Sequence, residues 1–201
     1  MRKLSKMLNQ VSDRPGTLGF TSRKDIEKPT VATFLSIKNK TDLKSIKTKD
    51  VSAILVTDES ILKSFDPPEG LLIGLDLREQ NKIANNSQLE EIDFAVVDLS
   101  STWTALDIEN CGLVLELELD EKTKDITEII QLLQGKPALP LDAILLSGSL
   151  SEALNIVQNQ LDIRRLNESI GLPLIIAGDL SNSDSDQLRA LGIKGLITST
   201  H

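Results

Sequence analysis

The chain has 201 residues, a single cysteine and a formal net charge of −8, with 40% hydrophobic and 26% charged residues. This length suits one domain with a sizeable core, and the composition is that of an ordinary globular protein. A lone Cys111 excludes an internal disulfide framework. No apolar run approaches the roughly 18 residues of a membrane span. Because the basic start of the chain also lacks the apolar core of a secretory signal, we expect a cytoplasmic protein without membrane contact, an organelle transit peptide being the alternative.

Charge is distributed unevenly along the chain. Residues 1–49 carry twelve Lys/Arg against four Asp/Glu, whereas residues 50–201 carry ten against twenty-six. We expect a basic amino-terminal segment at 1–28, followed by the main domain at 29–201. Basic segments of this kind can bind nucleic acid, but here the cations alternate with Asp, Thr and Ser and lack interleaved aromatic residues. The sequence therefore favours a basic segment that either lies against the acidic remainder or is simply solvated.

Short, β-branched, apolar runs recur about every twenty residues. Such near-continuous runs are typical of strands that are buried on both faces, as in parallel sheets. The eight runs are 29–37, 51–57, 70–76, 93–98, 112–118, 141–147, 172–178 and 193–199.

Helix signals lie between these runs. Asp125 and Glu128 open a predicted helix over 126–133, and Ser183 opens a short helix that ends at Gly192. Ser149 opens a longer amphipathic segment that places Leu154, Val157 and Leu161 on one face. The connections at 41–48 and 59–65 leave room for only two helical turns.

Alternating strands and helices predict a parallel α/β sheet. Eight such units favour a closed barrel of the triosephosphate-isomerase type over a doubly wound open sheet. The barrel is expected to be minimal, with short helices and no eighth helix after the last strand. We expect residues 3–11, which carry Leu4, Met7, Leu8 and Val11 at helical spacing, to cover the seam between the first and last strands. The alternative cover is a partner subunit in a homodimer.

In such barrels the catalytic groups follow the carboxyl ends of the strands. Two-residue alternation turns Asp76 and Arg78 of the third strand, Asp98 of the fourth and both Glu116 and Glu118 of the fifth toward this mouth. Lys38 follows the first strand with the same parity. We predict Asp76, Asp98, Glu116 and Lys38 as catalytic residues.

Carboxylates crowded into a partly buried space repel one another, so a cation or a proton must neutralise them, and this can happen in three ways. The first is a divalent metal such as Mg²⁺, held by Asp76, Asp98 and Glu118. The second is the pair of cations Lys38 and Arg78, and the third is protonation of one acid, which creates an acid–base pair. Two alternatives give no site: Glu116 in a lower polar layer with a lysine while the aspartates cap loops, or a different strand parity.

Substrate contacts are predicted at Arg78, Trp103, Ser147, Gly178 and Ser199. Trp103 follows the fourth strand, where its indole either covers a planar ligand or packs under the loop. Cys111 precedes the fifth strand, on the opposite face, and is expected to be a buried structural thiol. His201 is the one histidine, so neither a Ser-His-Asp triad nor a zinc cluster is expected.

The last quarter resembles the ribulose-phosphate-binding barrels, such as indole-glycerol-phosphate synthase, phosphoribosylanthranilate isomerase and thiamine-phosphate synthase. The likeness rests on Leu172-Pro-Leu-Ile-Ile-Ala-Gly178 and on Ala190-Leu-Gly-Ile-Lys-Gly-Leu-Ile-Thr-Ser-Thr200. It implies a barrel whose last two strands hold a substrate phosphate through backbone N–H groups, near Gly178 and Ser199. Asp179 and Thr198 stand where that family usually has glycine.

The sequence therefore predicts a barrel that binds a small polar metabolite, with a phosphorylated one among the options, and acts on it as a lyase or isomerase. The alternative is a non-catalytic barrel that serves as an interaction or scaffold protein.

Overall fold

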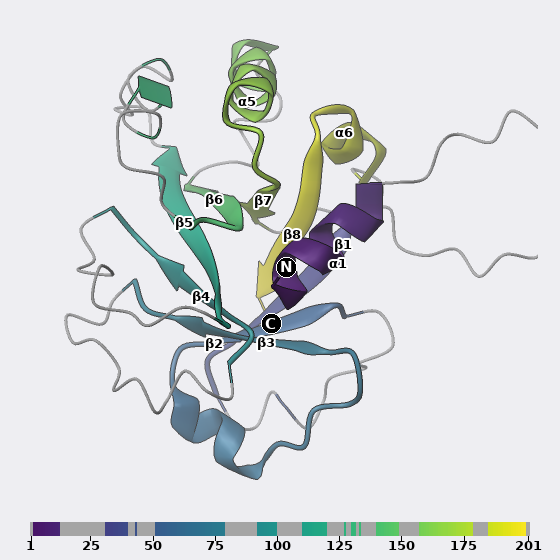
Figure 1. Ribbon diagram of the computed structural model, residues 1–201, viewed down its shortest axis with the longest axis vertical. Coiled ribbons are helices and arrows are strands. Elements are labelled where there is room, and N and C mark those ends of the chain that lie inside the picture. The colour runs from purple at the N-terminus through teal and green to yellow at the C-terminus, as the bar shows by residue number, and fades with distance from the viewer. Residues whose placement is uncertain are drawn as a thin grey trace, which may run out of the picture.

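The computed structural model contains one closed barrel of eight parallel strands, in the order of the sequence (Figure 1). It describes residues 2–12, 31–39, 43, 51–78, 92–99, 110–119, 127, 130, 131, 133, 140–148, 157–178 and 185–199. The strands are β1 (Ala32–Ile37), β2 (Ala53–Val56), β3 (Leu72–Asp76), β4 (Phe94–Val97), β5 (Gly112–Leu119), β6 (Ala143–Gly148), β7 (Leu174–Ala177) and β8 (Ile193–Ser199).

All eight predicted strands are present, each inside or close to its predicted run. The barrel closes where β1 pairs in parallel with β8, with Ser36 in register with Ser199. A slip of register between Leu174 and Ile175 interrupts the pairing of β7 with β8. The prediction of a minimal barrel of the triosephosphate-isomerase type with short helices is thereby confirmed.

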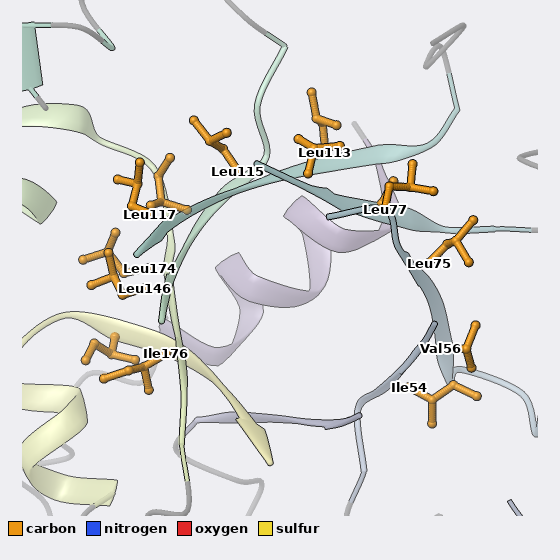
Figure 2. Close-up of a cluster of buried hydrophobic side chains, with 14 of the residues drawn as sticks. Ile54, Val56, Leu75, Leu77, Leu113, Leu115, Leu117, Leu146, Leu174 and Ile176 are labelled. Carbon is orange, nitrogen blue, oxygen red and sulfur yellow. The ribbon is translucent and has the colours of Figure 1, made fainter. Parts of the chain in front are cut away.

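The outer face of the barrel is apolar over β2 to β7, whereas β8 carries Lys194 and Thr198 there. Figure 2 shows side chains such as Leu75, Leu115 and Ile176 directed away from the ring of strands. They share a buried cluster with residues of the covering helices: Ile61 of η2 (Glu59–Ser64), Ile163 and Leu166 of α5 (Val157–Ile170), and Leu188 of α6 (Ser185–Ala190). None of the described helices is long and apolar enough to cross a membrane.

One predicted helix face is wrong. The amphipathic pattern places Leu161 on the buried face of its helix, but its side chain is 55% exposed, and α5 continues to Ile170. The helix instead buries Ile163 and Leu166, which lie on the face opposite Leu161, since side chains two residues apart point to opposite sides of a helix. The short helix predicted to end at Gly192 is present as α6, and Gly192 has a φ of +80°. The predicted helix at 126–133 and the connection at 41–48 lie mostly outside the described residues.

The barrel interior is filled by alternate residues of the strands. Phe34 and Phe94 meet edge to face at its centre, with ring centroids 5.8 Å apart and planes at 88°. Glycine makes this arrangement possible, because a Cβ on Gly74 would lie 2.2 Å from Cζ of Phe94. Likewise, a Cβ on Gly195 would lie 2.7 Å from the ring of Phe34.

The amino-terminal helix α1 (Lys3–Ser12) covers the end of the barrel where the strands begin. Leu4 and Leu8 are fully buried and belong to the interior cluster, and Leu4 lies against Gly112, the first residue of β5. In Figure 2 the helix lies across the opening of the ring. The predicted helix therefore exists, and it lies across the amino-terminal end of the barrel, in contact with β5 and with β1 and β8, the two strands of the seam. The division of the chain at residue 28 stays a prediction.

Candidate functional site

The inner positions of the strands change from apolar to polar at the carboxyl end of the barrel. On β3 the inner residues run Leu72, Gly74, Asp76, and on β5 they run Gly112, Val114, Glu116, with the apolar members inside the interior cluster. The polar residues at or just after the strand ends that share this parity include Ser36, Lys38, Thr57, Asp76, Arg78, Asp98, Glu116, Glu118, Ser147 and Ser199. The predicted strand parity is therefore right, and the mouth is lined by carboxylates on one side and hydroxyls on the other.

Arg78 joins two of the predicted carboxylates. Its Nε donates to Oδ1 of Asp76 over 2.8 Å and its second terminal nitrogen to Oδ2 over 2.5 Å, which is a two-point ion pair. Its other terminal nitrogen donates to Oε1 of Glu116. The backbone N–H of Arg78 also donates to Asp76 over 3.2 Å, so this aspartate shapes the turn after β3 as well. All three side chains are largely shielded, with 26%, 10% and 15% exposed for Arg78, Asp76 and Glu116.

This geometry decides how two of the acids are compensated. Hydrogen bonding to Asp76, with the charges of Asp76 and Glu116, raises the pKa of Arg78 above its already high ordinary value despite partial burial. The guanidinium is therefore a permanent cation at the mouth. Of the three predicted ways to neutralise the carboxylates, pairing with Arg78 is the one found for Asp76 and Glu116. The alternative, in which Glu116 pairs with a lysine, is not the arrangement found.

The other predicted acid–base residues lie around this triad of Asp76, Arg78 and Glu116. Asp98 directly follows Val97, the last residue of β4 in register with β5, and so lies level with Glu116. Glu118 is exposed and in register with Ser147 on β6. Lys38 is exposed one residue beyond β1, on the other side of the mouth from the triad. Of the four predicted catalytic residues, Asp76 and Glu116 are thus directly connected through Arg78.

The predicted substrate contacts are more dispersed. Ser147 and Ser199 lie on inner positions of β6 and β8, with Gly148 next to Ser147 at a φ of +104°. Gly178 follows β7, but its N–H donates to the carbonyl of Ile197 over 3.0 Å. The backbone donor that the resemblance assigns to Gly178 is therefore already engaged within the sheet. Trp103 lies outside the described residues.

Metal binding stays a prediction. Within the described ranges, no three His, Cys, Asp or Glu side chains are grouped so that they could hold an ion. Both oxygens of Asp76 accept hydrogen bonds from Arg78, so an ion held by Asp76, Asp98 and Glu118 would compete with that guanidinium.

Cys111 lies at the opposite end of the barrel, as predicted. Its side chain is 3% exposed, and burial raises the pKa of the thiol from 9.0 to about 12. A thiol in this environment is protonated at neutral pH and has no nucleophilic role.

A pH-dependent stability difference follows from this thiol. The folded state holds the Cys111 proton more tightly than the unfolded state, so stability is lost as the pH rises from about 9 toward 12. We expect wild type to lose about 1.4 kcal/mol per pH unit more than Cys111→Ala in this window. Urea unfolding of both proteins at pH 8, 9, 10 and 11 measures the difference, and parallel curves would contradict it.

Comparison with known proteins gives structural neighbours only. No protein-family model and no curated protein matches the sequence. A candidate lyase/mutase from Burkholderia cenocepacia superposes with a TM-score of 0.59 at 13% identity, over 98% of this chain and 82% of that one. The glycerol uptake operon antiterminator regulatory protein of Listeria monocytogenes also gives 0.59 at 13% identity, over 91% and 96%.

A 3-hexulose-6-phosphate synthase gives a TM-score of 0.56 at 14% identity, over 84% of this chain and 90% of that one. Identities this low carry the fold and not the activity, and the three neighbours are named for different activities. The predicted ribulose-phosphate-binding type therefore stays a prediction. What the neighbours and the strand order establish together is that the chain is an eight-stranded parallel barrel of the triosephosphate-isomerase type.

Proposed function

We propose that the chain binds a small polar metabolite at the carboxyl-terminal mouth and moves a proton on it, in a reaction of the lyase or isomerase class. The observation that carries this proposal is the triad in which Arg78 joins Asp76 of β3 to Glu116 of β5. The triad lies at the carboxyl-terminal mouth of the barrel, which is where the catalytic residues of this fold are found.

The triad suits proton abstraction next to a carbonyl group. Glu116 is the expected general base, because Arg78 binds its Oε1 and its second carboxylate oxygen remains to accept a proton. Arg78 is a positioning residue for both acids. Its side-chain bonds to Asp76 and Glu116 use three of its five N–H donors, so the remaining two can hold a carbonyl oxygen as negative charge develops on it.

The substrate class follows from the balance of charge. Arg78 already faces two carboxylates, so a further dianion beside it is unfavourable. Hydroxyl or carbonyl groups are better matched to the triad, with Ser147 and Ser199 as polar contacts across the mouth. A phosphate, if the metabolite carries one, would lie on the side of Lys38 and Ser199. Soluble cytoplasmic location remains part of this proposal, as does a homodimer.

Hydrogen exchange with solvent tests the proposal even while the reaction product is unidentified. Hydroxy acids, sugar phosphates and amino acids are first screened for thermal stabilisation of the full chain, and each binder is then incubated in D₂O and followed by NMR. We expect one class to exchange a carbon-bound proton, and we expect Glu116→Gln to slow exchange by about 10²-fold or more.

Glu168→Gln is the matched control, because Glu168 is 71% exposed on α5 and pairs with Arg164 of the same helix, away from the mouth. It is expected to exchange like wild type. Exchange that persists in Glu116→Gln, or binders whose exchange does not depend on the protein, would overturn the proposal. Repeating the assay with Mg²⁺ and with a chelator tests the predicted metal at the same time.

A non-catalytic barrel is the second candidate. It is favoured by the neighbour described as an antiterminator regulatory protein, which covers 91% of this chain with the same TM-score as the lyase/mutase. A metabolite that stabilises the protein, loses binding in Glu116→Gln and never exchanges a proton would support this candidate over the enzyme.

A further inference from the structure

The amino end of α1 is fastened to the barrel by polar contacts far apart in sequence. Arg2 donates to Oδ2 of Asp142 over 2.6 Å, and the Ser5 hydroxyl donates to the other oxygen of the same carboxylate. Lys3 donates to Asp93 over 2.7 Å. Asp142 directly precedes β6 and Asp93 directly precedes β4, so α1 is bound to the ends of two strands.

Added negative charge beside these contacts would be repelled by the carboxylate of Asp142. Asp142 is 7% exposed and also accepts the backbone N–H of Leu113 over 3.0 Å. Arg2 and Lys3 neutralise Asp142 and Asp93 one for one. A second anion at Ser5 would therefore face the Asp142 carboxylate, whose partner Arg2 is already engaged.

We propose that Ser5 is a phosphorylation site that controls whether α1 is docked. Arg2 and Lys3 precede Ser5 by three and two residues, which is the charge pattern that serine kinases with acidic substrate clefts select. The Oγ–H bond breaks and an Oγ–P bond forms to the γ-phosphorus of ATP. ADP leaves, and the proton passes to the catalytic aspartate of the kinase.

Modification removes the hydroxyl donor and adds about −1.5 to −2 charge beside Asp142. Docked α1 has only ten residues, too few to stay helical alone, so releasing its polar end also releases Leu4 and Leu8. The helix must open transiently for a kinase to reach Ser5, which is half-buried when docked. Phosphate then keeps it open and exposes the amino-terminal end of the barrel.

Cys111 serves as the reporter of this opening, because the charge of Arg2, at the docked end of α1, acts on its thiol. It is the one cysteine of the chain, it is 3% exposed, and it precedes Gly112, on which Leu4 rests. Full-length protein is treated with cyclic-AMP-dependent kinase and ATP after folding, the site is mapped by mass spectrometry, and the thiol is titrated with a chromogenic disulfide reagent. We expect phosphate on Ser5 and labelling about tenfold faster than in untreated protein.

Ser5→Glu and Ser5→Gln form a matched pair, since the two side chains have similar size and differ in charge. The glutamate variant is expected to label faster than the glutamine variant, while hydrogen exchange of the strands stays as slow as in wild type, which separates helix release from global unfolding. Absence of phosphate on Ser5, unchanged labelling after phosphorylation, or equal rates in the two variants would each overturn the proposal.

Discussion

Replacing Arg78 with methionine is expected to lower the free energy of unfolding at pH 7 by about 2–4 kcal/mol. The expected loss is near the lower end of the range for breaking a buried ion pair, because Arg78 is 26% exposed. The loss arises because Asp76 and Glu116 stay shielded from water while their shared cation is gone. Urea unfolding at fixed pH measures it.

The pH dependence of this loss identifies its cause. With Arg78 removed, two nearby carboxylates disfavour the charged form, so the folded variant binds protons more readily than the unfolded chain. Stability of the variant relative to wild type should therefore recover as the pH falls toward 4 and the carboxylates become neutral. A loss caused by packing alone would stay constant with pH.

Arg78→Lys is the conservative control. Lysine keeps the charge but cannot bind Asp76 at two points and Glu116 at a third, so we expect an intermediate loss with little pH dependence. An Arg78→Met protein that unfolds at the same urea concentration as wild type between pH 5 and 8 would show that the triad does not stabilise the fold.

Replacing Leu4 with alanine is expected to cost about 2–4 kcal/mol of stability. The side chain of Leu4, on α1, is fully buried in the amino-terminal opening of the barrel and packs against the first residue of β5. Thermal and urea unfolding measure the loss. Leu161→Ala on α5 is the control for composition, since Leu161 is 55% exposed and should change stability by less than about 0.5 kcal/mol.

The contact between Leu4 and Gly112 can be tested with a pair of substitutions. A Cβ at Gly112 would lie 3.2 Å from Cβ of Leu4 and 3.3 Å from its Cδ2, so Gly112→Ala alone is expected to destabilise by about 1–2 kcal/mol. In the double variant, Leu4→Ala removes the Cδ2 contact and keeps the Cβ contact, so the combined loss should be somewhat smaller than the sum of the two single losses. Strict additivity would mean that α1 does not rest on β5 at this point.

The strands and the parity of their side chains can be predicted because both are local properties. Runs such as 51–57 or 193–199 are apolar on both faces, and alternation then directs Asp76 and Glu116 inward without reference to the rest of the chain. Helix faces are harder to predict. Leu161 fits an amphipathic pattern, but which face of α5 meets the barrel depends on how the helix docks in the folded chain, and the face that docks carries Ile163 and Leu166.

Partners far apart in sequence cannot be predicted in the same way. Arg78 and Glu116 are both predicted site residues, but their ion pair links positions 38 apart and requires the order of strands in space. The role of Asp142 escapes sequence reasoning altogether, because it depends on Arg2 and Ser5, 140 and 137 residues away. The available signal is a lone acid directly before an apolar strand, together with a basic residue ahead of an amphipathic helix.

The rings of Phe34 and Phe94, which meet edge to face, form an apolar layer across the interior of the barrel. Phe94 rests on Gly74, one inner position before Asp76, and its Cβ would lie 3.3 Å from a Cβ on Gly112, beside Leu4. An apolar layer of the barrel interior therefore lies between the mouth and the end that α1 covers. Water admitted by release of α1 would be excluded by this apolar layer, so the chemistry of one end can be altered without hydrating the other.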